Sequence, residues 1–113
     1  MSKSLADLTS RGLAIAAQYD ELNLAERGRT WTRAETLMGF VGDVGDLAQL
    51  AMAADGVRSD LGTAEDTHAA LAHELADCLW AVLVLAERYE VDLEAAYDAT
   101  MDEIEQRLTP DRP

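Results

Sequence analysis

Apolar residues recur along the chain at intervals of three and four, the spacing that places side chains on one face of an α-helix. Four segments carry this pattern, and none shows the two-residue alternation that is typical of a strand. We expect the first helix over residues 4–26, the second over 32–54, the third from a start within 63–67 to about 89, and the fourth over 92–108. The pattern therefore predicts an all-α fold made of four helices.

Several residues mark the ends of these helices. Thr32 and Glu35 have the T-x-x-E spacing of a capping box, in which each side chain bonds an amide of the first helical turn. Gly28 is a stop signal after the first helix, and Asp92 is a good N-cap for the fourth. The polar segment 55–66, which opens with an Asp-Gly turn signal, separates the second helix from the third.

The middle of the third helix is apolar on every side over residues 78–86, so it needs cover from all directions. The chain has only 113 residues, its 49% of apolar residues are rich in alanine, and aromatic residues make up 5%. A chain of this kind forms one domain, residues 1–113, with a thin core. We therefore expect the helices to pack as an oligomeric bundle, a homodimer or a homotetramer.

The charge balance is strongly acidic, with a net charge of -13 from 22 acids and 9 bases. This composition argues against binding to a nucleic-acid polymer or to an anionic membrane surface, both of which require clustered Lys and Arg. Cys78 is the only cysteine, the N-terminus does not resemble a signal peptide, and the longest uncharged apolar run is 78–86. That run is far short of the roughly 20 residues that span a bilayer. We expect a cytoplasmic protein.

Four acids differ from the solvated majority. Asp43 and Asp46 are three residues apart on the second predicted helix, and Glu74 and Asp77 are three apart on the third. Residues at this spacing lie on the same side of a helix, where like charges repel. Both pairs are embedded in apolar sequence with few basic residues nearby, so the ionised carboxylates carry a desolvation cost.

A divalent cation resolves this cost if the second and third helices pack antiparallel. The two acidic pairs then face each other, and four carboxylates supply oxygen ligands for Mg²⁺, with Mn²⁺ as an alternative. Inward-facing carboxylates in helical bundles are an established way to build such a site. The other interpretation is that these acids merely border the core, because two pairs at this spacing are common by chance.

At the same residues the chain resembles a known family. Gly42-Asp-Val-Gly-Asp-Leu-Ala48, then His73-Glu-Leu-Ala-Asp77, then Val91-Asp-Leu-Glu-Ala-Ala96 are similar to the MazG-like all-α nucleotide pyrophosphohydrolases. That family carries E-x-x-E on one helix and E-x-x-D on the next. The resemblance covers residues 31–108. It departs from the family in the Asp residues at 43 and 46, and in Thr100 and Ile104, where relatives often have Lys and Asn.

The resemblance implies a magnesium-dependent enzyme that hydrolyses a nucleoside or deoxynucleoside triphosphate to the monophosphate and pyrophosphate. Asp43, Asp46, Glu74 and Asp77 would be its catalytic metal ligands, with Asp43 or Asp46 accepting the proton of the attacking water. The alternative is a catalytically weak nucleotide-binding or metal-binding protein, or a helical interaction protein, of the same fold.

Three further residues are candidates for contact with the substrate. Trp31 precedes the second helix near the region where relatives contact the base, and its neighbour Arg33 would reach a phosphate. Trp80 lies one turn after Asp77. Aromatic rings stack on bases, although a Trp in apolar sequence more often packs in the core. His73 is assigned to solvent or to a structural hydrogen bond.

Overall fold

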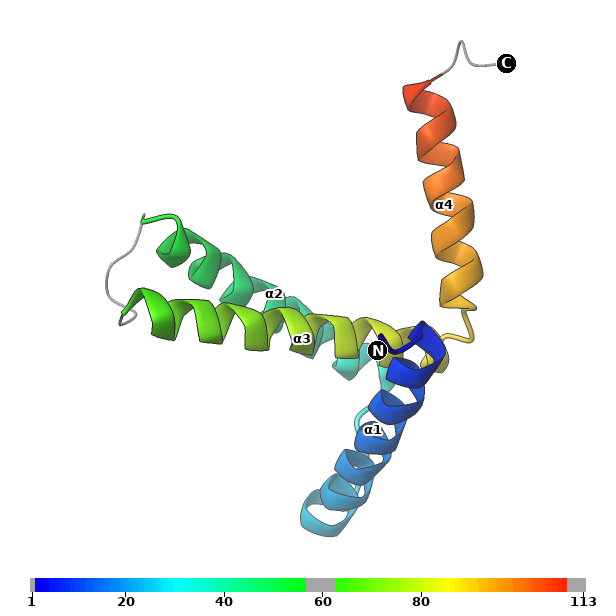
Figure 1. Ribbon diagram of the computed structural model, residues 1–113. Helices are drawn as coiled ribbons and strands as arrows, with labels where there is room; N and C mark the ends of the chain where they lie inside the picture. Colours follow the sequence, from blue (N-terminus) through cyan, green and yellow to red (C-terminus); the bar gives the residue numbers. More distant parts are fainter. Residues whose placement is uncertain (1, 57–62, 110–113) are drawn as a thin grey trace.

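The computed structural model describes residues 2–56 and 63–109, which form four α-helices and no strand (Figure 1). The helices are α1, Leu5–Arg27; α2, Arg33–Ala54; α3, Ala64–Arg88; and α4, Leu93–Leu108. These bounds lie within one residue of those expected from the sequence, and the all-α prediction is confirmed. Much of the predicted polar loop, at 57–62, lies outside the described residues.

Side chains at the helix starts explain why these bounds are sharp. Ser4, Thr32 and Thr63 each accept a hydrogen bond from an amide of the first turn, and each is part of a capping box. The Asp92 side chain likewise accepts a hydrogen bond from the amide of Ala95 at the start of α4, but without the return bond of a capping box. Gly28 ends α1 in the left-handed conformation, with φ of 74°, which a residue with a side chain adopts only at a cost.

Helices α2 and α3 form an antiparallel hairpin, which is the central feature of the fold (Figure 1). Helix α1 crosses the C-terminal half of α3, and α4 extends away from the junction. The buried apolar core is small and lies where α1 meets α3, at Ala16, Ala81, Leu83 and Val84. The middle section of the hairpin therefore lies outside this core.

Large apolar side chains remain exposed on every helix. On α2, Met38 is 68% exposed and no residue of the helix is buried. On α4, apolar side chains follow one another at intervals of four, three and four, namely Tyr97, Met101, Ile104 and Leu108. Within the run 78–86, for which the sequence predicted complete cover, Leu79 is still 46% exposed. An isolated chain leaves these apolar faces exposed to water. The expected oligomer stays a prediction, and the physical reason for it is that a second copy would cover them.

By length and composition alone, helices α2 and α3 are both long and apolar enough to cross a membrane. Each of these apolar segments is longer than the uncharged run 78–86 that was singled out from the sequence. Each carries two of the four acids near its centre, at 43 and 46 or at 74 and 77. Charged side chains at the centre of a bilayer cost several kcal/mol. We therefore interpret the apolar faces as surfaces for packing against protein.

Candidate functional site

The hairpin brings the four acids of the sequence pattern into one interhelical gap. Carboxylate oxygens of Asp43 and Asp46 on α2 and of Glu74 on α3 all lie within 4.8 Å of one another. Asp77, one turn further along α3, offers a carboxylate oxygen within 4.8 Å of Glu74, and its charge contributes to the raised pKa of Asp43. Because both pairs lie near the middle of antiparallel helices, the pairing of α2 with α3 makes them meet.

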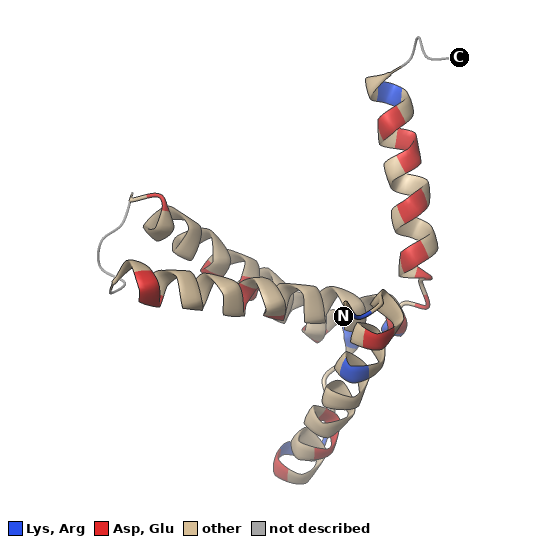
Figure 2. Cartoon of the chain, in the orientation of Figure 1, with Lys and Arg blue, Asp and Glu red and all other residues tan. Residues whose placement is uncertain are grey.

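Glu74 is the most unusual member of this group. Its Oε2 atom is buried, and no hydrogen-bond donor among the described residues reaches it. A buried carboxylate oxygen without a partner costs free energy, because it has lost water and gained nothing in return. The hairpin offers it no permanently charged basic partner, since no Lys or Arg occurs within 34–56 or 63–87 (Figure 2).

The local field is strongly negative. Burial raises the pKa of Asp43, and the charges of Asp77 and Asp46 raise it further. Burial also raises the pKa of the Cys78 thiol, with smaller effects from Asp43 and the two acids of α3. Both groups hold their protons more tightly than usual, because the gap resists additional negative charge. The carboxylate donors and the unpartnered Glu74 oxygen fit a hard divalent cation.

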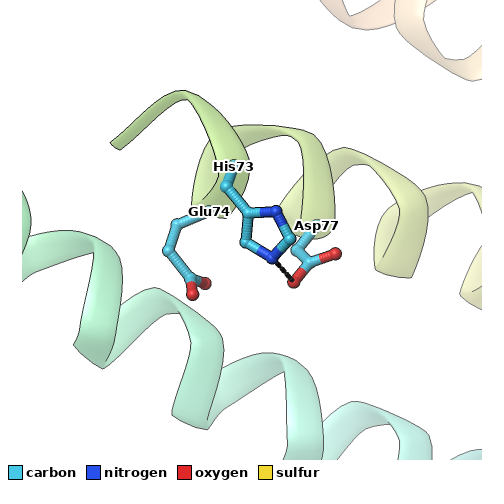
Figure 3. A group of neighbouring side chains, drawn as sticks. All are labelled: His73, Glu74 and Asp77. Carbon is cyan, nitrogen blue, oxygen red and sulfur yellow. Dashed lines mark ion pairs between the residues drawn. The ribbon is translucent and has the colours of Figure 1, made fainter. Parts of the chain in front are cut away.

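His73 lies at the edge of the same cluster (Figure 3). Its Nε2 is 3.3 Å from Asp77 Oδ2, while its side chain remains 72% exposed. Figure 3 shows Glu74 extending toward α2 and the imidazole lying beside Asp77. His73, Glu74 and Asp77 each offer a ligand atom within 4.8 Å of the others. The exposure of His73 and its contact with Asp77, four residues further along the helix, agree with its assignment to solvent or to a structural contact.

A cavity of about 390 Å³ adjoins the acidic cluster. It is lined by α1, Trp31, the first half of α2 and the second half of α3, and Asp43 belongs both to its wall and to the cluster. Four aromatic side chains line it: Tyr19, Trp31, Phe40 and Trp80. A hollow with aromatic walls next to an acidic cluster can hold a planar ring on one side and a cation on the other.

Both tryptophans are held against glycines. Trp80 Nε1 donates a hydrogen bond of 2.9 Å to the carbonyl oxygen of Gly12, and its ring leans on that of Tyr19, with centroids 5.8 Å apart. A Cβ at Gly12 would lie 3.1 Å from Trp80, and one at Gly39 would lie 3.2 Å from Trp31. Side chains at either glycine would therefore press on the cavity walls.

Of the three predicted substrate contacts, the structure places two at the cavity. Trp31 and Trp80 line it, whereas Arg33 is absent from its wall. The Arg33 guanidinium instead lies over the Tyr89 ring, 4.4 Å from its centroid, and donates to the carbonyl oxygen of Arg88. That position explains Arg33 as a link between α2 and α3, and the roles of all three residues remain predictions.

Sequence reasoning missed several polar residues of the cavity. Asp20, Asn23 and Arg27 from α1 and Arg88 from α3 all line it. Asp20 and Arg88 form an ion pair of 3.3 Å at the wall of the cavity. No local pattern marks these residues, because an acid on a helix and an Arg in a last helical turn are ordinary surface features.

A comparison with known families covers the region of the acidic cluster. A model of the MazG nucleotide pyrophosphohydrolase domain matches residues 41–110, more than half of the chain, and includes all four acids. Comparison with curated proteins and with solved structures gives no significant match. Given the extent of the match and the four-helix fold, the chain belongs to the MazG nucleotide pyrophosphohydrolase family.

Proposed function

We propose that this protein is a magnesium-dependent pyrophosphohydrolase that converts a nucleoside or deoxynucleoside triphosphate to the monophosphate and pyrophosphate. The observation that carries the proposal is the unpartnered, buried Glu74 oxygen in a group of carboxylates that borders an aromatic cavity. Membership of the family supports the reaction class. The cavity and the cluster meet at Asp43, so a ligand that fills one reaches the other.

In this proposal the acids hold the metal. Asp43, Asp46, Glu74 and Asp77 supply oxygen ligands, which Mg²⁺ prefers, and Mn²⁺ is an alternative. The ion would supply a Lewis acid and a positive charge between the carboxylates and the phosphate oxygens. Asp43 or Asp46 accepts a proton from the attacking water. Asp46 is exposed and open to water, whereas Asp43 is half-buried and reaches the cavity.

The cavity receives the nucleoside. Trp31 and Trp80 present aromatic surface to a base, which stacks on such rings with little dependence on its identity. Along α3 the cavity wall runs from Trp80 to Arg88, and eight residues of helix cover about 12 Å. A nucleotide lying along this wall keeps its base among the aromatic residues and its phosphates toward Asp43.

We also propose that the protein works as a homodimer or a homotetramer. The hairpin exposes apolar side chains from both of its helices, including Met38 and Val41 of α2 and Leu75 and Leu79 of α3. A second copy that covers these residues would remove apolar surface from water, which stabilises the assembly by about 25 cal/mol for each Å² buried. Light scattering after size-exclusion chromatography tests this proposal, and a monomer at micromolar concentration would contradict it.

The decisive experiment measures pyrophosphate release from a panel of canonical and modified nucleoside triphosphates with Mg²⁺, with Mn²⁺ and with EDTA. We expect metal-dependent release of pyrophosphate and the monophosphate from at least one nucleotide, because transfer at the α-phosphate leaves the β- and γ-phosphates joined. The Glu74→Gln variant should lose at least 100-fold in kcat, since removal of one stabilising group in a phosphoryl or acyl transfer site costs about that much.

Glu21→Gln is the matched control, because Glu21 is an exposed acid of α1 outside both the cluster and the cavity. It should hydrolyse the same nucleotides at the wild-type rate. Absence of pyrophosphate release across the panel, or full activity in Glu74→Gln, would overturn the proposal. Release of orthophosphate instead would place the reaction at a different phosphorus.

A further inference from the structure

Arg88 connects three elements around the cavity. Its Nη2 approaches the Asp20 carboxylate of α1 at 3.3 and 3.4 Å. Its Nη1 lies 3.4 Å from the carbonyl oxygen of Trp31, in the segment that joins α1 to α2. The Arg88 side chain is 24% exposed and Asp20 is 38% exposed, so water shields this pair only in part. One planar guanidinium thus joins α3 to α1 and to the backbone of Trp31.

A second set of contacts runs from α2 to the end of α3. Arg33, two residues after Trp31, donates to the carbonyl oxygen of Arg88 at 3.3 Å and covers the ring of Tyr89. Two hydrogen bonds therefore join this region to the last turn of α3: one from Arg33, at the start of α2, to Arg88, and one from Arg88 to Trp31, in the segment before α2. Trp31 lies between these contacts, with its backbone fixed by Arg88.

The side chain of Trp31 has little support of its own. It is 42% exposed, and its ring rests on Gly39, where a Cβ would approach within 3.2 Å. Trp80 differs, because its indole N–H is bonded to Gly12 and its ring contacts Tyr19. Of the two tryptophan walls, the Trp31 wall therefore depends on the contacts made by its backbone.

We propose that Arg88 and Asp20 are positioning residues for nucleotide binding, which hold Trp31 as the wall of the base cavity. This inference rests on the proposed function. Arg88 acts through Trp31, and Asp20 acts by orienting the Arg88 guanidinium. Loss of either residue releases the segment 28–32 and weakens binding of the nucleoside, while the acids that act on the phosphates keep their arrangement.

The test compares Arg88→Gln, Asp20→Asn and the double variant with wild type. For the best nucleotide of the panel we expect KM to rise about tenfold in each single variant, with kcat within about twofold, which corresponds to about 1.4 kcal/mol of binding. The KM of the double variant should be no higher than that of the more impaired single variant, because both changes break the same connection. Hydrogen exchange of the free protein should accelerate at amides 28–32 in all three.

Arg107→Gln is the control, because Arg107 forms an exposed ion pair with Glu103 on α4, away from the cavity. It should change neither KM nor exchange at 28–32. If Arg88→Gln does not fold, Arg88→Lys keeps the charge but lacks the planar fork, and it should show the same rise in KM and in exchange at a smaller size.

Two outcomes would overturn the proposal. If Asp20→Asn leaves KM unchanged while Arg88→Gln raises it, Arg88 contacts the nucleotide directly. If exchange at 28–32 is unaltered, Trp31 does not depend on Arg88. Should wild type hydrolyse no nucleotide at all, the proposed function fails, and the positioning role is judged by exchange and by binding of nucleoside monophosphates in EDTA.

Discussion

Replacement of Glu74 by glutamine should change the stability of this protein in opposite directions with and without metal. Oxygens of Glu74, Asp43 and Asp46 lie within 4.8 Å of one another. At that separation two unit charges repel by about 0.9 kcal/mol in water and by about 3.5 kcal/mol at an effective dielectric constant of 20. Asp46 is exposed and Asp43 half-buried, so values near the lower end apply.

Glutamine removes both of these repulsions and a third one from Asp77, whose carboxylate also lies within 4.8 Å of Glu74, and it replaces the unpartnered carboxylate with a neutral amide. Water screens part of this repulsion in wild type, because Asp46 is exposed and Asp43 is only half-buried. We therefore expect Glu74→Gln to stabilise the metal-free protein by about 1 to 2 kcal/mol, or roughly 4 to 8 °C in Tm for a chain of this size. This gain is unusual for a mutation at a half-buried position, since most such changes destabilise.

Metal reverses the order. An ion present at a hundred times its Kd stabilises wild type by about 2.7 kcal/mol, and Glu74→Gln lacks one of the ligands. In saturating Mg²⁺, wild type should therefore unfold at the same temperature as the variant or above it. Calorimetry at mildly alkaline pH and fixed protein concentration measures both conditions, and Glu21→Gln should follow wild type in each. A lower Tm for Glu74→Gln in EDTA, or no effect of Mg²⁺ and Mn²⁺ on wild type, would refute this account of the cluster.

Two further predictions concern the framework of the cavity and the start of α2. Gly12→Val places a branched side chain against Trp80, with its Cβ 3.1 Å from the indole ring, and should lower the free energy of unfolding by about 1 to 3 kcal/mol in chemical denaturation. Gly42 has open space around it, so Gly42→Ala should instead stabilise α2 by about 0.5 to 1 kcal/mol. Equal effects of the two substitutions would contradict the contact with Trp80. The Arg29 hydrogen bond, with the Thr32 amide, lowers the pKa of Glu35 from 4.5 to about 2, so its stabilising contribution is complete above pH 4.5 and disappears as the pH falls toward 2. The stability difference between wild type and Glu35→Gln should shrink over that interval, and a constant difference would count against the ion pair.

The features that the sequence predicted well are local ones. Helix starts follow from side chains three residues away, as at Thr32 and Glu35, and the left-handed stop at Gly28 needs only that residue. The prediction that the two acidic pairs meet required one assumption, that α2 and α3 pack as an antiparallel hairpin. The short segment between these helices favours that arrangement. Oligomerisation and the roles of the site residues stay predictions.

The features that the sequence did not reveal depend on contacts between distant residues. Trp80 bonds to Gly12 and Arg88 to Asp20, each pair 68 residues apart. Gly12 is a weak helix former by its sequence, and only the crossing of α1 over α3 shows that a larger residue would strike Trp80. The stacking of Arg33 on Tyr89 was missed for the same reason, because these residues are far apart in the sequence and meet only where α2 packs on the end of α3.

The distribution of charge gives the metal a second task in the proposed function. The hairpin lacks Lys and Arg over 34–56 and 63–87, so a triphosphate beside Asp43 meets only negative charge from this chain (Figure 2). Of the two cations that line the cavity, Arg88 is paired with Asp20, and Arg27 donates to the side-chain oxygen of Asn23; both come from outside the acidic hairpin segments. Because like charges at close range repel, a divalent ion is then required for the phosphates to lie beside the carboxylates at all, as well as for the reaction. In the proposed function, recognition is consequently divided: the aromatic walls would bind the nucleoside, and the ion would supply the positive charge between the carboxylates and the polyphosphate.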